Sequence, residues 1–124
     1  MIRRACFTAI AIVVVACVLS EAVAAQLASR PAAEWTKTLE SPERIAGLRI
    51  DEVIARLNLK PSDVVADLGA GTGLFSLPMA KAVSSGRVYA VELDEGFLAQ
   101  IRGKAKTANI TNVVPVLGKF TDPS

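Results

Sequence analysis

The feature that most constrains the fold is the stretch from Val64 to Gly73, VVADLGAGTG, which reads as a strand running into a glycine-rich turn. Val64 to Leu68 is a short apolar run broken only by Asp67, a composition typical of a central parallel strand that is buried on both faces. Leu74 to Val83 then carries an apolar-rich helical pattern, and Pro78 within it predicts a kink or a late start of the helix. This order of strand, turn and helix predicts an α/β domain.

Three glycines in the turn, Gly69, Gly71 and Gly73, let the backbone turn sharply and let a ligand approach the main chain. A helix N-terminus at this point offers unpaired N–H groups and a partial positive charge. The dinucleotide fingerprint G-x-G-x-x-G requires its third glycine at position 74, where this chain has Leu74. Asp67 stands two residues before the first glycine, where it disfavours an anionic pyrophosphate and suits a zwitterionic ligand with a cationic group.

The same segment resembles motif I of class I S-adenosylmethionine-dependent methyltransferases, an acid and one further residue followed by G-x-G-x-G. A second strand is predicted over Gly86 to Asp94, and its Glu92 matches the acid that takes the two ribose hydroxyls of the cofactor in that family. The resemblance implies S-adenosylmethionine as the cofactor and identifies no catalytic base and no metal site. The cofactor-binding residues that it implies are Asp67, Gly69, Ala70, Gly71, Thr72, Gly73, Glu92 and Leu93.

Short helices are predicted before the first strand. Ser41 is placed to cap a helix in which Pro42 takes the first position. We expect a break near Gly47, after which Asp51 caps a second helix whose apolar face covers the sheet. Class I methyltransferases place similar helices before their first strand.

The sequence after the second strand predicts one more helix and one more strand. Asp94 can cap the helix, and the strand spans Asn112 to Leu117 with a proline that indicates an edge position. Many family members carry an acid for the adenine amino group just after this strand, whereas this chain has Lys119 there. Asp122 and Phe120 are alternatives for contacting adenine, and each is equally well explained as an ordinary loop residue.

The N-terminal residues 1–24 have the layout of a secretory signal peptide. Two arginines precede an apolar run from Ala5 to Leu19, and small residues follow up to Ala22-Val23-Ala24. Two alternatives stay open: an uncleaved membrane anchor, and lipidation at Cys17, because Val14 to Cys17 resembles a bacterial lipobox. The pattern predicts an exported protein, periplasmic or secreted, that meets a membrane only through this segment or its lipid.

Composition narrows the possible chemistry. Hydrophobic residues make up 52% of the 124, and much of this excess lies in the N-terminal segment. Both cysteines, Cys6 and Cys17, also lie there, and the chain has no histidine, which excludes histidine bases and histidine metal ligands. Cleavage after residue 24 changes the counts of basic and acidic residues from 14 and 12 to 12 and 11. Such a nearly neutral chain gives no indication of nucleic-acid binding.

The predicted organisation is a signal peptide over 1–24, an N-terminal extension over 25–40 and a partial domain over 41–124. The fold class is α/β, a Rossmann-like class I methyltransferase fold limited to its first β-α-β-α-β half and preceded by short helices. A complete domain of this family continues through four more strands. The chain therefore reads as a truncated copy or partial product, or as one whose missing strands come from a partner.

The expected function is S-adenosylmethionine-dependent methyl transfer, with activity in doubt because the second half is absent. The acceptor is unknown, and similarity to quinone-biosynthesis-type enzymes suggests a small molecule. Export argues against this function, because S-adenosylmethionine is made in the cytoplasm. Two alternatives therefore remain: an exported, non-catalytic Rossmann-like binding domain, and an NAD-dependent oxidoreductase half-domain.

Overall fold

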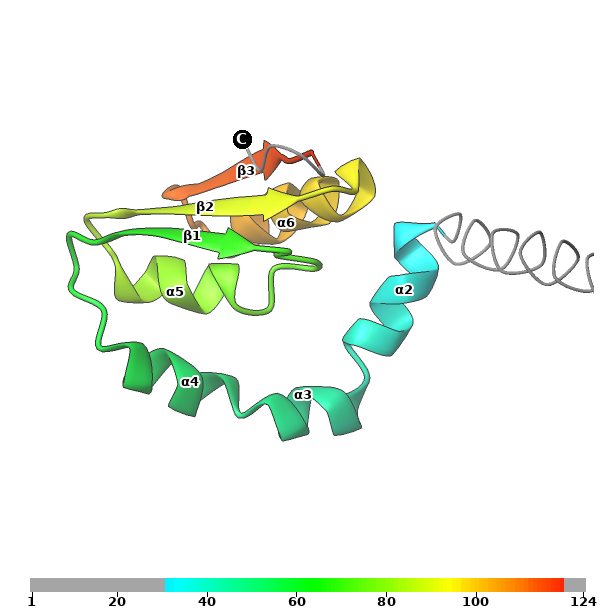
Figure 1. Cartoon of the computed structure of the whole chain (residues 1–124), viewed down its shortest axis with the longest axis horizontal. Helices are drawn as coiled ribbons and strands as arrows, with labels where there is room; N and C mark the ends of the chain where they lie inside the picture. Colours follow the sequence, from blue (N-terminus) through cyan, green and yellow to red (C-terminus); the bar gives the residue numbers. More distant parts are fainter. Residues whose placement is uncertain (1–30, 120–124) are drawn as a thin grey trace, which may run out of the picture. The chain divides into compact units, whose positions relative to one another are not determined.

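The computed structural model describes residues 31–119, and three strands form a parallel sheet at its centre (Figure 1). They are β1 (Val64–Leu68), β2 (Arg87–Glu92) and β3 (Val113–Leu117), in the spatial order β1-β2-β3. Val88 of β2 lies opposite Val65 on one side and Val113 on the other. The predicted β-α-β-α-β order is confirmed, and β3 lies at an edge as its proline indicated.

Two crossover helices, α5 (Ser76–Ala82) and α6 (Glu95–Thr107), cover one face of the sheet (Figure 1). Both crossovers step in the same direction along the sheet, and because such connections are right-handed, both helices fall on the same side. Val88 and Ala90 alternate along β2 toward this side and are fully buried. Leu98 and Ile101 of α6 complete the core against Ala90.

The first strand is more exposed than its sequence predicts. Val64 is 69% exposed and Leu68 is 67% exposed, and exposed and half-buried residues alternate along β1. The prediction that this strand is buried on both faces is wrong for the described part of the chain. The physical reason is that β1 pairs only with β2 there, and the described crossover helices cover one face alone.

Three short helices precede the sheet: α2 (Ala32–Leu39), α3 (Pro42–Leu48) and α4 (Ile50–Leu57). Ser41 caps α3 as predicted, because its Oγ accepts from the backbone N–H of Arg44 at 3.4 Å.

The junction between α3 and α4 differs from the prediction. It lies at Arg49, which has a left-handed conformation (φ 47°, ψ 49°), and Gly47 stays inside α3. Asp51 lies within the first turn of α4 and does not cap it. Arg49 Nε donates to Glu52 Oε1 at 2.7 Å, which ties the junction to the first turn of α4.

The helix α2 lies within the expected extension 25–40 and is fastened to α6. Thr36 Oγ1 donates to Gln100 Oε1 at 2.9 Å, and Lys104 Nζ donates to Glu40 just after α2. The compact unit of which these helices form part begins at Ala32. The predicted signal peptide, Cys17, Phe120 and Asp122 lie outside the described residues. Within 31–119, every helix is too short or too polar to cross a membrane.

Candidate functional site

The glycine turn has the backbone that its sequence predicts. Gly69, Gly71 and Gly73 have φ values of 72°, 52° and 83°, in the left-handed region that side chains disfavour. A Cβ atom on Gly73 would also lie 3.0 Å from Ile101 Cγ1 of α6. The third glycine therefore serves packing as well as conformation.

The N–H groups of this turn are largely taken up within the protein. Those of Gly69 and Ala70 donate to the carbonyl oxygen of Val91, at 2.9 and 3.0 Å. The N–H of Gly71 donates to Glu92 Oε2 at 2.8 Å. The end of β2 therefore already uses these three N–H groups, and the expectation for the N-terminus of the helix after the turn stays a prediction.

The helix after the turn starts late, which is one of the two outcomes that Pro78 predicted. It begins at Ser76 instead of Leu74, and Pro78 falls in its first turn, where no intrahelical N–H partner is needed. Ser76 Oγ donates to Asp67 Oδ2 at 2.5 Å, and Ser76 is fully buried. This contact joins β1 to the start of α5, and the predicted role of Asp67 toward a ligand stays a prediction.

The carboxylate of Glu92 is oriented by backbone N–H groups. Its Oε1 accepts from Leu93 at 2.6 Å and from Asp94 at 3.3 Å, while Oε2 accepts from Gly71. This places the charge between the carboxyl end of β2 and the glycine turn. A carboxylate held this way can accept hydrogen bonds from ligand hydroxyls, with Gly71 as the competing donor.

A cavity of about 320 Å³ opens beside this carboxylate. Its walls are Glu92, the turn from Gly69 to Thr72, and Leu39, Arg44 and Leu48 from the N-terminal helices. We call it the turn cavity. Five predicted site residues line it, whereas Asp67, Gly73 and Leu93 do not. Sequence reasoning did not assign Leu39 or Leu48 to a ligand site, because their approach depends on how α2 and α3 fold back.

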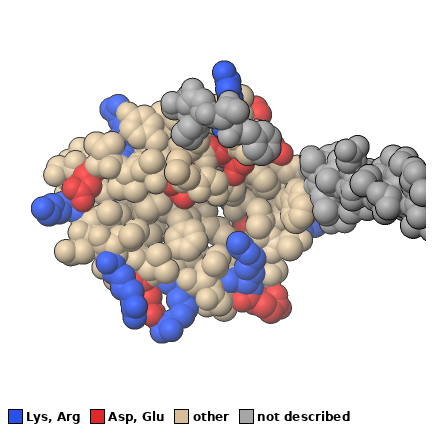
Figure 2. Space-filling model, in the orientation of Figure 1, with Lys and Arg blue, Asp and Glu red and all other residues tan. Residues whose placement is uncertain are grey.

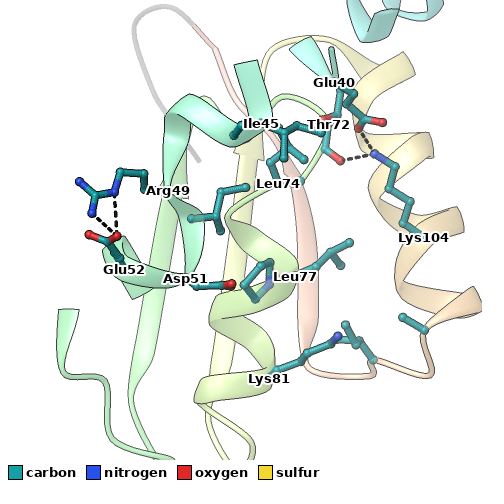
Figure 3. A pocket seen from close by; sticks show the side chains of 16 residues that line it. Glu40, Ile45, Arg49, Asp51, Glu52, Thr72, Leu74, Leu77, Lys81 and Lys104 are labelled. Atoms are coloured by element: carbon teal, nitrogen blue, oxygen red, sulfur yellow. Dashed lines mark hydrogen bonds and ion pairs between the residues drawn. The ribbon is translucent and has the colours of Figure 1, made fainter. Parts of the chain in front are cut away.

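A second cavity, of about 640 Å³, lies between the α3–α4 pair and the helices α5 and α6 (Figure 3). Ile45 and Leu77 form part of an apolar wall, and Lys81 lies toward one end. Thr72 and Leu74 line both cavities, which therefore share a wall.

A charged group closes one end of the second cavity. Lys104 Nζ donates to Glu40 and, at 3.0 Å, to the backbone oxygen of Thr72 (Figure 3). Burial raises the pKa of the Glu40 carboxyl, but the hydrogen bond and charge of Lys104 and the nearby Thr72 hydroxyl outweigh it, so the pKa lies below its usual value. Within the described chain, Thr72 Oγ1 is buried without a partner in full hydrogen-bonding geometry, although it lies near enough to Glu40 to act on this pKa. Residues 31–119 hold no cluster of acidic, histidine or cysteine side chains suited to a metal ion.

Comparison with known proteins relates this segment to methyltransferases. Residues 65–124 match the family model described as a methyltransferase domain. The chain is 44% identical over 64 residues to the 23S rRNA (uracil(1939)-C(5))-methyltransferase RlmD of Legionella pneumophila. That match covers 52% of this chain and 14% of the relative, so the chain spans only a small part of the length of that protein.

Solved structures give the same relation for the fold. A SAM-dependent methyltransferase from Aquifex aeolicus superposes with a TM-score of 0.58 and 27% identity, covering 65% of this chain and 44% of that one. A coclaurine N-methyltransferase bound to N-methylheliamine and SAH superposes with a TM-score of 0.56 and 26% identity, and the match covers 64% of this chain and 22% of that one. The predicted Rossmann-like fold, present here in part, is confirmed.

Proposed function

We propose that this chain, which resembles the S-adenosylmethionine-dependent methyltransferases in its first strands and helices, binds S-adenosylmethionine in the turn cavity and serves methyl transfer. The family match over 65–124 and the structural neighbours support this enzyme class and this cofactor. The chain covers 14% of its curated relative, so a complete activity is part of the proposal.

One observation carries the proposal: the Glu92 carboxylate lies at the carboxyl end of β2, hydrogen-bonded to the glycine turn, and both line one ligand-sized cavity. In parallel sheets, ligands bind outside the carboxyl ends of the strands. A carboxylate at that point can accept from both hydroxyls of a ribose. The predicted contacts of Gly69, Ala70, Gly71 and Thr72 with the cofactor remain part of the proposal, as do those of Asp67, Gly73 and Leu93.

The chemistry itself belongs to the cofactor, whose sulfonium methyl is activated for in-line displacement by a nucleophile. The contribution of the chain is to hold and orient the ligand, which is a large part of catalysis when two reactants must meet in line. Glu92 fixes the ribose, and the turn shapes the wall against which the ligand lies. Glu92 is also the only acidic side chain on the described wall of the turn cavity, so we assign no general base.

For the acceptor, two chemical classes are supported by different observations. A small molecule agrees with the mixture of acidic and basic side chains along the face in Figure 2, where no single-sign field is seen, and with the ligand of coclaurine N-methyltransferase. An RNA is suggested by the curated relative, which is named for ribosomal RNA and does not support the expected absence of a nucleic-acid partner.

Tritiated S-adenosylmethionine incubated with the protein and cell extract separates the two classes. Radioactivity in ribonuclease-sensitive material identifies RNA, and radioactivity that survives ribonuclease and passes a small-pore filter identifies a small molecule. A matched incubation with heat-denatured protein gives the background.

We also propose export of the chain, on the evidence of the pattern in residues 1–24. Mass spectrometry of the protein recovered from cell fractions tests it. A mature N-terminus at Ala25 or Gln26 in the periplasm or medium supports cleavage, and a lipid on Cys17 supports anchoring. An intact N-terminus in the cytoplasm contradicts both, and it also removes the difficulty of cofactor supply.

The cofactor proposal itself is tested by isothermal titration of the folded full chain with S-adenosylhomocysteine and, separately, with NADH. Saturable binding of the first and none of the second supports the proposal. Binding of NADH alone favours the oxidoreductase alternative, because the turn then tolerates a dinucleotide despite Leu74. Binding of neither leaves the non-catalytic domain as the better account.

A further inference from the structure

Thr72 lies in the middle of the glycine turn and lines both cavities. Its neighbours Gly71 and Gly73 have φ values of 52° and 83°. Because glycine populates a wide range of backbone conformations, the peptide between Thr72 and Gly73 is held by its contacts more than by its own torsional preference. The shape of the cavity wall at this point therefore depends on the groups that fix that peptide.

Two hydrogen bonds fix this peptide. The N–H of Gly73 donates to the carbonyl oxygen of Ala70 at 2.9 Å, within the turn. The carbonyl oxygen of Thr72 accepts from Lys104 Nζ of α6 at 3.0 Å (Figure 3). Within the described chain, the Thr72 hydroxyl has no partner in full hydrogen-bonding geometry. The bond from Lys104 is therefore the side-chain anchor of Thr72.

Glu40 holds the Lys104 ammonium beside the turn. Lys104 Nζ donates to the Glu40 carboxylate, and the two side chains are 34% and 27% exposed. Withdrawing an ammonium from water is costly unless it is paired, so the carboxylate offsets the cost of holding Lys104 against Thr72. An ionised donor also makes a stronger hydrogen bond than a neutral one.

Lys104 does not line the turn cavity, so it acts on a ligand there only through the turn. Gly71, the residue before Thr72, donates its N–H to Glu92 Oε2 at 2.8 Å. A continuous series of contacts thus runs from α6 through Thr72 and Gly71 to the carboxylate assigned to the ribose. A displacement of Thr72 changes both the cavity wall and the hydrogen-bond partner of Glu92.

We propose that Lys104 is a positioning residue, which holds the glycine turn from α6 in the shape that binds the cofactor and raises cofactor affinity without touching the ligand. This inference rests on the proposed function, because it concerns the same cavity. The physical reason is preorganisation: a site that is already ordered loses less conformational entropy when the ligand binds.

The test measures the affinity of the purified full chain for S-adenosylhomocysteine by isothermal titration. Lys104→Met keeps an unbranched stem and removes the ammonium, and it should weaken binding by about 5- to 10-fold because a charge-assisted bond is lost. Lys104→Arg should recover part of the affinity, since a guanidinium also donates to a carbonyl oxygen. If Lys104→Met does not fold, Lys104→Gln takes its place with the same expectations.

A spectroscopic measurement on the ligand-free protein tests the anchor directly. The backbone nitrogen of Gly73 belongs to the peptide whose carbonyl accepts from Lys104, and a hydrogen bond polarises the group that accepts it. The nitrogen chemical shift of Gly73 should therefore change in Lys104→Met. An unchanged shift would overturn the anchor, whether or not a ligand binds.

Two matched variants separate positioning of the turn from general stability. Thr36→Val removes the 2.9 Å bond to Gln100, which weakens the attachment of α2 to α6 without touching the turn. Lys106→Met removes an exposed lysine of α6 that lines neither cavity. Both should leave the affinity within about twofold of the wild type, since the carbonyl contact is intact, and the Gly73 shift unchanged.

Equal affinity losses in Lys104→Met and Thr36→Val would overturn the inference, because attachment of the helices would then explain both. Wild-type affinity in a folded Lys104→Met variant would also overturn it and would leave the proposed function standing. No binding by the folded wild type would instead overturn the proposed function.

Discussion

Gly86 illustrates how much a single residue decides in this domain. A Cβ atom there would lie 1.9 Å from the backbone oxygen of Asp63, which also accepts from the N–H of Arg87 at 3.1 Å. We expect Gly86→Ala to lower the free energy of unfolding by about 3 kcal/mol, because the backbone must move apart where β1 and β2 begin. Urea denaturation followed by circular dichroism measures the change.

Gly103 is the matched control for this prediction. It lies inside α6, and nothing stands within 4 Å of the Cβ position. Gly103→Ala should raise the free energy of unfolding by up to about 1 kcal/mol, because alanine favours the helix. Equal stability losses in both variants would contradict this interpretation of the two glycines.

Features that depend on neighbouring residues, such as helix caps, were predicted from the sequence, whereas contacts between residues distant in sequence were not. Ser41 and Asp94 cap their helices as predicted, since the partner of a cap lies within three residues. The break between α3 and α4 was expected near Gly47 and lies at Arg49, because a non-glycine residue in the left-handed conformation has no composition signal. The approach of Arg44 to the glycine turn was likewise hidden, because it depends on the path of the helices between them.

At the scale of elements, α2 is attached to α6 by the contact of Glu40 with Lys104. The pKa of Glu40 is lowered in the folded chain, so its stabilising contribution is complete above the unfolded value of 4.5 and is lost as the pH falls through the folded value. Glu40→Gln should reduce the free energy of unfolding at pH 7 by up to about 1 kcal/mol, because the pair is partly exposed.

Urea denaturation at pH 7 and pH 3 measures the loss in the free energy of unfolding caused by Glu40→Gln and shows in which direction it changes with pH. The difference between wild type and Glu40→Gln should shrink in acid. Glu43→Gln, on the exposed side of α3, is the control and should have little effect at either pH. A difference that grows in acid would show that the carboxylate destabilises the attachment.

The three strands were predicted to within two residues at either end, since their apolar runs are bounded by turn residues. The solvent exposure of β1 was not predicted. A run of apolar residues indicates a strand that can be buried, but it does not show which other elements cover that strand. Val64 and Leu68 therefore remain open to solvent in the described chain.

This exposed face leads to a prediction for the element β1. Val64→Thr should change the free energy of unfolding by less than about 0.5 kcal/mol, since the site is already in water. It should also weaken binding of a dye that fluoresces on apolar surfaces. Val88→Thr, at a fully buried position of β2, should cost about 2 kcal/mol because its hydroxyl enters the core. Equal costs at the two positions would show that the face of β1 is covered in solution.

At the scale of the whole molecule, one site brings together parts of the chain that are far apart in sequence. The N-terminal helices, the glycine turn and the end of β2 all line the turn cavity. The sequence predicted the last two through a spaced motif. The sequence could not predict the contribution of the N-terminal helices, because no local pattern indicates which surface a short helix packs against.

The most direct test of the cofactor site is the affinity of S-adenosylhomocysteine for the full chain and for Glu92→Gln, measured by isothermal titration. Glu95→Gln is the control, since Glu95 is an exposed acid of α6 that lines neither cavity and pairs with Arg102. We expect saturable binding by the wild type and the control, and a loss of at least about tenfold in Glu92→Gln, because a charge-assisted bond to the ribose is removed. Unchanged affinity in a folded Glu92→Gln variant, or no binding by the folded wild type, would contradict the account.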